Sequence, residues 1–306
     1  MRILLPPSEA KHPGGRRRQP ADQSAQANPA DQSAQADPIQ ANPIQANAGR
    51  RGDRYGQAFA ELHRYRAELL EALARLLERP DAATALQLPP SVAEPALATN
   101  RQVATAPTLP AMRRYAGTVY QGLDVAGLSP AAARRARTEL LIFSGLLGVS
   151  RGGDPAPDYR VPAKAVLPGV GVAGTFWRRR LAPLLPALLD TGPVVDLRST
   201  DYAAMWQPPS NSALVGRLIA VRVLSPTPSG RLAVVSYRSK LAKGRLAAAL
   251  LERQAAGRTV TGPADVLAAW AELGGRDGHS STTARGTALE LVESAIPYTG
   301  PAGRSA

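Results

Sequence analysis

Apolar residues recur at helical spacing over one long segment, Tyr55 to Arg79. They form a single stripe of Phe59, Leu62, Leu69, Leu70, Leu73, Leu76 and Leu77. Such a stripe predicts an amphipathic helix, and Pro80 ends it because proline cannot continue the hydrogen-bond ladder. Apolar spacing and helix-start signals predict further helices over Met112–Leu123, from Ser129-Pro130, over Thr175–Leu189 and over Thr261–Leu273.

Short continuous apolar runs, which are typical of buried strands, alternate with these helices. They cover Met1–Leu5, Leu140–Phe143, Val194–Leu197, Leu218–Leu224, Arg231–Tyr237 and Thr287–Val292. The turn residues Pro226–Gly230 predict a hairpin between the fourth and fifth runs, whereas Gly274–Arg285 predicts a loop. Because hairpins and helical crossovers both occur, the sequence predicts an α/β (mixed) protein with one mixed β-sheet surrounded by helices.

One segment has no such pattern. Ala21–Pro29 (ADQSAQANP) is repeated with one change as Ala30–Pro38 (ADQSAQADP), and decayed copies follow. This Gln-, Asn- and Asp-rich composition cannot bury enough apolar surface to order itself. We therefore predict a single domain formed by residues 1–13 and 54–296, a disordered insertion at 14–53 and a flexible tail at 297–306.

Composition excludes several kinds of chemistry. The 306-residue chain has no cysteine, so disulfides and thiolate sites are impossible. Its three histidines are well separated and no carboxylate cluster stands out, so neither a metal nor a cofactor is expected. No Rossmann or phosphate-loop glycine signature is present. No apolar run approaches a membrane span and no signal peptide is recognisable, which predicts a cytoplasmic protein.

The net charge of +13 favours a polyanionic partner such as nucleic acid. The repetitive insertion, with its boundary, holds six arginines and four aspartates, so it carries only two of these charges. Only four of the 37 basic residues are lysines: Lys11, Lys164, Lys240 and Lys243. In a chain this rich in arginine, the remaining lysines are enriched at positions where a compact ammonium is needed.

Two of these lysines lie in Arg231–Leu251, which begins as a strand-like run and ends as an Ala- and Leu-rich helix-like segment. Between the two runs, Ser236 to Arg245 reads as a strand-to-helix turn of hydroxyls, cations and one glycine. A turn of this kind suits anion binding, because free N–H groups at a helix start act together with nearby cations. A solvated basic turn is the alternative. Other polar groups follow the strands ending at Leu5, Phe143 and Leu197.

Four segments in order resemble the YaaA family, which is linked to peroxide stress. They are Leu4–Lys11 (LLPPSEAK), Phe143–Arg160 (FSGLLGVSRGGDPAPDYR), Asp196–Tyr202 (DLRSTDY) preceded by Phe176-Trp177, and Val235–Gly244 (VSYRSKLAKG). The resemblance implies a single-domain mixed α/β fold with a positively charged cleft that binds duplex or branched DNA. It implies no established reaction. The family's helix-hairpin-helix-like segment would fall near Leu88–Asn100, where Pro89, Pro90 and Pro95 predict an interruption.

The leading hypothesis is a DNA-binding protein that protects against oxidative stress through a basic cleft at strand ends. The predicted phosphate contacts are Lys11, Arg151, Arg160, Arg198, Lys240 and Lys243, and the predicted supporting polar residues are Ser8, Asn100, Ser144, Ser199, Tyr202 and Ser236. The alternative is an enzyme acting on a nucleotide or modified base, with Asp154, Asp196 and Lys240 as candidate catalytic groups. In a third interpretation these polar loops only satisfy one another. The sequence leaves the oligomeric state open.

Overall fold

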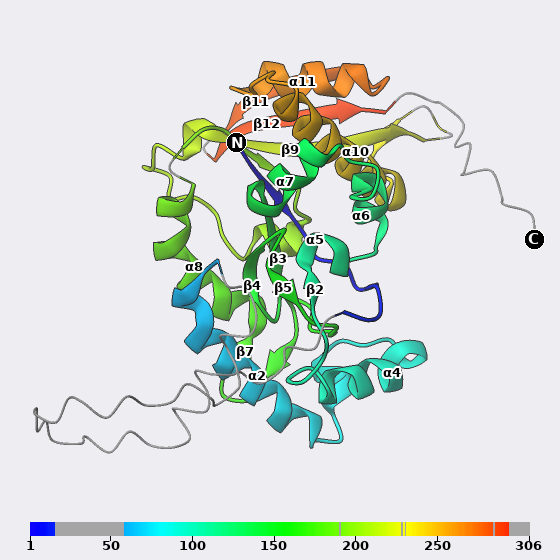
Figure 1. Cartoon of the computed structure of the whole chain (residues 1–306), viewed down its shortest axis with the longest axis vertical. Helices are drawn as coiled ribbons and strands as arrows, with labels where there is room; N and C mark the ends of the chain where they lie inside the picture. The colour runs from blue at the N-terminus through cyan, green and yellow to red at the C-terminus, as the bar shows by residue number, and fades with distance from the viewer. Residues whose placement is uncertain (16–57, 190, 228, 230, 284, 294–306) are drawn as a thin grey trace, which may run out of the picture.

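The computed structural model describes residues 1–15, 58–189, 191–227, 229, 231–283 and 285–293. Its centre is a mixed sheet in the order β11-β12-β9-β8-β1-β3-β4, with β10 paired to β9 (Figure 1). These strands are β1 (Arg2–Leu5), β3 (Leu140–Ser144), β4 (Gly148–Arg151), β8 (Val194–Asp196), β9 (Leu218–Pro226), β10 (Leu232–Ala233), β11 (Arg276–Thr283) and β12 (Gly286–Val292). The predicted fold class is confirmed.

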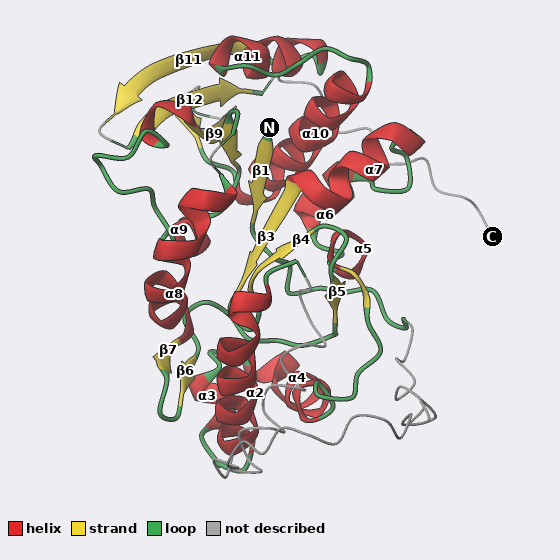
Figure 2. Ribbon diagram, turned by 60° about the vertical axis from the view of Figure 1, so that its left-hand side comes forward, coloured by secondary structure: helices red, strands yellow, loops and turns green. Residues whose placement is uncertain are grey.

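The parallel part of the sheet explains the apolar runs. β1 pairs in parallel with β3 and β8, β8 with β9, and β9 with β12, while β4 and β11 run antiparallel at the two edges. Parallel strands are covered on both faces, and Ile3, Leu4 and Leu5 are accordingly fully buried. Figure 2 shows α8 (Ala173–Leu188) and α9 (Thr200–Ala203) on one side of these strands and α6 (Thr118–Leu123), α7 (Pro130–Glu139) and α10 (Ser236–Ala255) on the other.

A second group of elements lies beyond the carboxyl end of β1 (Figure 2). It comprises η1 (Ala60–Leu62), α2 (His63–Leu77), α3 (Ala82–Ala85), α4 (Pro90–Arg101) and the short strand pairs β2 (Leu109–Pro110) with β5 (Pro155–Ala156) and β6 (Val166–Leu167) with β7 (Gly171–Val172). The remaining elements are α5 (Ala111–Arg114), η2 (Val215–Arg217) and α11 (Pro263–Glu272). One continuous core contains residues from β1 through β12.

Most predicted helices are confirmed. The leucine stripe forms α2 and buries Leu69, Leu73 and Leu76. Ser129 caps α7 by accepting a hydrogen bond from the Ala132 N–H. The segment predicted as one helix over Met112–Leu123 is divided at Tyr115, whose backbone is extended.

The prediction of an interruption near Leu88–Asn100 is wrong. α4 runs as one helix from Pro90 to Arg101. Pro90 stands in its first turn, where proline's missing N–H has no intrahelical partner to lose. Pro95, inside the helix, costs about one backbone hydrogen bond, and the helix still buries Ala96 and Asn100.

Two other predictions are wrong, because two segments rich in polar residues form a regular strand and a regular helix. Arg276–Thr283 forms the edge strand β11, although its polar composition predicted a loop. The second hairpin strand ends at Ala233, and Ser236–Arg245 is the first half of α10 rather than a turn. An edge strand and a partly exposed helix need only one buried face, so a polar run within them is compatible with either structure.

Close backbone contact holds α6 against α10. A β-carbon on Gly244 would lie 1.9 Å from the Val119 carbonyl oxygen, and one on Gly122 would lie 2.1 Å from the Leu241 carbonyl oxygen. The two glycines therefore let the helix backbones approach more closely than any side chain permits.

Within the described residues, no helix is long and apolar enough to cross a membrane. The predicted repeat insertion lies outside the described residues except for its first two, and the predicted tail lies wholly outside them.

Candidate functional site

The order of the strands in the sheet indicates which edge of the molecule is suited to bind a ligand. The chain passes from β1 to β3 on one side, and later returns to place β8 on the other side of β1. In open α/β sheets, ligands bind beyond the carboxyl ends of the strands where the strand order reverses in this way. The segments that leave this edge carry Ser8 to Lys11, Ser144, and Arg198 to Tyr202.

Lys11 is half-buried among aromatic rings at this edge. Its Nζ lies 4.5 Å from the ring centre of Tyr159 and 5.6 Å from that of Tyr115. The ammonium donates a hydrogen bond of 3.0 Å to the Ser8 carbonyl. Loss of water around the amine lowers the pKa of Lys11 to about 8, with Arg160 and Arg114 acting in the same direction and Glu9 and Asp158 against it.

The two tyrosines form a buried pair. Their hydroxyls lie 2.7 Å apart, within hydrogen-bond distance. Burial raises the pKa of Tyr115 to about 12 and that of Tyr159 well above its ordinary value, while the Ser144 hydroxyl acts to lower both pKa values. Tyr115 is the extended residue between α5 and α6, and it forms a β-bridge with Lys11. This pairing brings Tyr115 next to the lysine. We call Lys11, Tyr115 and Tyr159 the lysine–tyrosine cluster.

An ion pair borders this cluster. The Arg160 Nε lies 2.9 Å from a Glu9 carboxylate oxygen. Buried Asn100 fixes the backbone of Arg160, because its side-chain oxygen accepts from the Arg160 N–H at 2.8 Å and its amide donates to the Arg160 carbonyl at 3.0 Å. Asn100, at the end of α4, thus connects the outer helices to the cluster.

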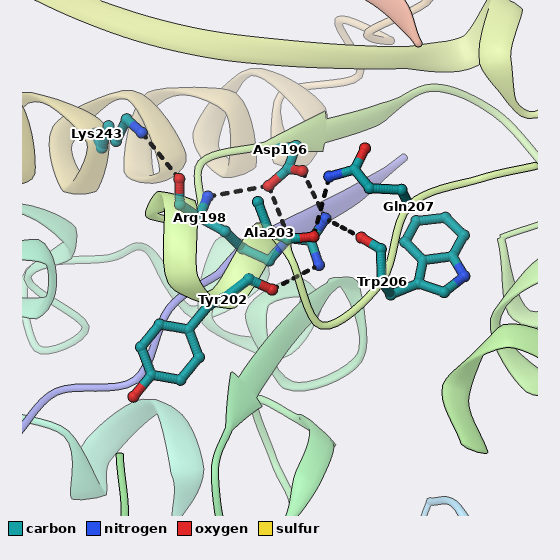
Figure 3. Close-up of polar contacts among 7 residues, drawn as sticks. All are labelled: Asp196, Arg198, Tyr202, Ala203, Trp206, Gln207 and Lys243. Carbon is teal, nitrogen blue, oxygen red and sulfur yellow. Dashed lines mark hydrogen bonds and ion pairs between the residues drawn. The ribbon is translucent and has the colours of Figure 1, made fainter. Parts of the chain in front are cut away.

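A second polar group, shown in Figure 3, begins with the last residue of β8 and continues into the segment after it. Arg198 donates from Nε and Nη2 to the two carboxylate oxygens of Asp196, at 2.9 and 2.7 Å. The Arg198 side chain is 0% exposed, and its remaining donors reach the carbonyls of Tyr202 and Trp206. Lys243 donates to the Arg198 carbonyl at 3.2 Å.

These contacts determine the charge states after β8. Burial acts to raise the pKa of Asp196, but Arg198 and Lys243 outweigh it and leave the pKa of that carboxyl lowered. Burial lowers the pKa of Lys243, and Asp196 opposes that shift. The Arg198 side chain is fully buried and engaged by these groups, so its predicted role as a phosphate contact does not fit its geometry.

Tyr202 joins the two polar groups. Its carbonyl accepts from Arg198 at 3.2 Å, whereas its ring points away from the ion pair (Figure 3). Burial is the main cause that raises the pKa of Tyr202, and Glu9 and Tyr115 also contribute. Tyr120 lies nearby, with its ring centre 5.3 Å from that of Tyr115 and its hydroxyl donating to the Pro6 carbonyl.

Asp154 and Arg151 form a third group of polar contacts. The Asp154 carboxylate accepts from the Arg151 N–H at 2.8 Å and from the Ala58 N–H at 3.3 Å. Burial raises the pKa of Asp154, while these hydrogen bonds and Arg66 oppose the rise. Fully buried Arg66 donates to three backbone carbonyls and was not singled out from the sequence. Asp154 thus organises a loop.

The remaining predicted residues are at the surface or support the backbone. Lys240 is exposed on α10, one helical turn before Lys243, and Ser236 is exposed at the start of that helix. Ser199 is exposed before α9, Ser8 is half-buried, and the Ser144 hydroxyl accepts from the Leu147 N–H. Among the described residues, no group of histidines and carboxylates could hold a metal ion.

Sequence reasoning selected Tyr202 as a supporting polar residue but missed the other three tyrosines of the site. Four of the chain's eight tyrosines gather here: Tyr115, Tyr120, Tyr159 and Tyr202. Only their scarcity in a chain with 5% aromatic residues could have drawn attention to them.

The fold and site define a mixed α/β protein with a lysine–tyrosine cluster at the carboxyl edge of its sheet. The chain belongs to the family of the peroxide stress protein YaaA, whose family model matches residues 1–261. This match confirms the resemblance that the four motifs indicated.

Relatives support the same assignment. The chain is 42% identical to a UPF0246 protein of Streptomyces coelicolor over 179 residues, which cover 58% of this chain and 65% of that protein. It is 32% identical to a UPF0246 protein of Corynebacterium efficiens over 252 residues, covering 82% and 84% of the two chains. A UPF0246 protein of Salinispora tropica is 31% identical over 218 residues, covering 70% of this chain and 78% of that protein.

Proposed function

We propose that this member of the family binds duplex DNA and that it acts in the peroxide stress response through this binding. The observation that carries the proposal is the net charge of +13, of which the repeat insertion holds only two. Affinity for DNA phosphates comes from cationic side chains that no ion-pair partner already neutralises. Among the described residues, Arg134, Arg137, Lys240 and Arg245 are exposed and have no ion-pair partner.

Lys240 is the best-placed phosphate contact of the six predicted from the sequence. It is exposed one turn from Lys243, whose ammonium lies at the segment that follows β8. Lys11 and Arg160 are half-buried at the same edge and partly engaged by Ser8 and Glu9. Lys240 therefore supports DNA binding from the solvent side of this edge.

Replacing Lys240 by alanine should weaken duplex binding and reduce the salt dependence of the affinity by about one phosphate contact. Fluorescence anisotropy of a labelled duplex, titrated at several salt concentrations between about 50 and 200 mM, measures both quantities. Lys164→Ala is the matched control, because it removes the same charge from an exposed lysine that already pairs with Asp201 at 2.9 Å.

Two results would count against this reading. Wild-type affinity that does not change with salt contradicts DNA binding through phosphates. Equal salt slopes for Lys240→Ala and Lys164→Ala contradict the contact at Lys240.

A second candidate function is catalysis on a nucleotide or modified base. The lysine–tyrosine cluster favours it, because an amine of lowered pKa beside phenols is chemistry that phosphate binding does not require. The candidate catalytic groups predicted from the sequence support it less. Asp196 is paired with Arg198 and Asp154 holds a loop, while Lys240 is an exposed helix residue.

A further inference from the structure

Lys11 differs from the other lysines in its surroundings. Its amine lies over the Tyr159 ring at 4.5 Å and donates hydrogen bonds to the backbone carbonyls of Ser8 and Glu9, at 3.0 and 3.5 Å. Lys164, in contrast, is exposed and paired with Asp201. Burial without a carboxylate at ion-pair distance among the described residues favours the neutral amine, although the ring faces and the backbone carbonyls stabilise the ammonium.

A neutral amine is a nucleophile toward carbonyl carbon. With its pKa at about 8, about a tenth of Lys11 is neutral at pH 7. An ordinary lysine is neutral there in only about one molecule in three thousand. Several groups face this amine and set the balance between its neutral and its protonated form. They are Glu9, Asp158, Arg160, Arg114 and the two tyrosines.

We infer that Lys11 is a nucleophile that forms an imine with an aldehyde carried by DNA, such as the ring-opened sugar of an abasic site. The inference rests on the proposed DNA binding and deepens it by naming the substrate class. The location suits a DNA lesion because the amine lies beyond the carboxyl edge of the sheet and the Arg160 guanidinium, paired with Glu9, faces it.

The chemistry balances without an oxidant or a cofactor. The nitrogen lone pair of Lys11 forms a bond to the aldehyde carbon, and one amine proton moves to the former carbonyl oxygen. The resulting hydroxyl leaves as water with the second amine proton, and a carbon–nitrogen double bond remains. We assign the transfer of these protons to the paired hydroxyls of Tyr115 and Tyr159, whose rings face the Lys11 amine.

Borohydride trapping tests the inference, because it reduces an imine to a stable amine. The probe is a duplex with one abasic site, and the control duplex carries a tetrahydrofuran analogue that lacks the aldehyde. We expect a covalent complex on denaturing gels with the first duplex only. Lys11→Arg keeps the charge but removes the nucleophile, so trapping should fall at least about tenfold, whereas Lys164→Arg should trap like the wild type.

Peptide mapping of the trapped wild-type protein gives an answer even if Lys11→Arg does not fold. The chain offers only four lysines and the amino group of Met1, so the modified residue is readily assigned. An adduct on Lys11 supports the inference, and an adduct on Met1 or another lysine overturns it. Reversible binding of the abasic duplex without any adduct overturns the inference and leaves DNA binding standing. Absence of any binding overturns both.

Discussion

Replacing Arg198 by alanine is expected to lower the free energy of unfolding by roughly 3–5 kcal/mol. The substitution leaves the Asp196 carboxylate buried without its two hydrogen bonds of 2.9 and 2.7 Å. It also removes donors from the carbonyls of Tyr202 and Trp206. Chemical denaturation followed by circular dichroism measures the change.

The matched control is an exposed ion pair in the same sheet. Arg222 pairs with Glu290 at 3.1 Å with both side chains largely in solvent, so Arg222→Ala should cost less than about 1 kcal/mol. A double variant, Asp196→Ala with Arg198→Ala, should be less destabilised than the sum of the two single variants, because no unpaired charge remains. Equal losses for Arg198→Ala and Arg222→Ala would contradict the stabilising role of the buried pair.

The same pair predicts a dependence on pH. The pKa of the Asp196 carboxyl is lowered in the folded protein, so the stabilisation is present above its unfolded pKa of about 4 and is lost as the pH falls through the folded value. The difference in stability between the wild type and Arg198→Ala should therefore shrink on acidification below roughly pH 4. A difference that stays constant to lower pH would contradict this assignment.

Gly244→Ala is expected to cost about 3 kcal/mol or more, because the added β-carbon would meet the Val119 carbonyl oxygen at 1.9 Å. Neither backbone can yield without separating α6 from α10. Alanine has a higher helix propensity than glycine, so any loss of stability in this variant comes from the contact between the two helices. Thermal unfolding followed by circular dichroism provides the measurement.

Gly216→Ala provides the control for this substitution. A β-carbon there has open space around it, and Gly216 lies in the short helix η2. We expect a change within about 1 kcal/mol, in the stabilising direction, because alanine reduces the freedom of the unfolded chain. If Gly244→Ala melts at the wild-type temperature, the described contact between α6 and α10 is wrong.

The amino-acid sequence was sufficient for the centre of the fold. β1, β3 and β8 are buried on both faces, so their residues form uninterrupted apolar runs that can be recognised without a structure. The sequence failed where an element has one exposed face. β11 and the first half of α10 carry polar residues, and their order comes from pairing with β12 and packing on α6.

The candidate site divides in the same way. The scarcity of lysine and the position of Lys11 after an apolar run single it out from the sequence alone. Its partners Tyr115 and Tyr159 are more than a hundred residues away in the chain, and no local pattern links them to it. Arg198 and Asp196 were recognised as a motif, but only the structure showed that they neutralise each other.

The sequence by itself determined the family, the mixed α/β class and the edge of the sheet where polar residues gather, because apolar runs and the residues that follow them are local properties of the chain. The tertiary structure alone decided which charges are buried in pairs and which amine lies among aromatic rings. Burial and the distance between side chains depend on how β1, β3 and β8 bring remote segments together, and these two quantities set the charge state and reactivity of each group.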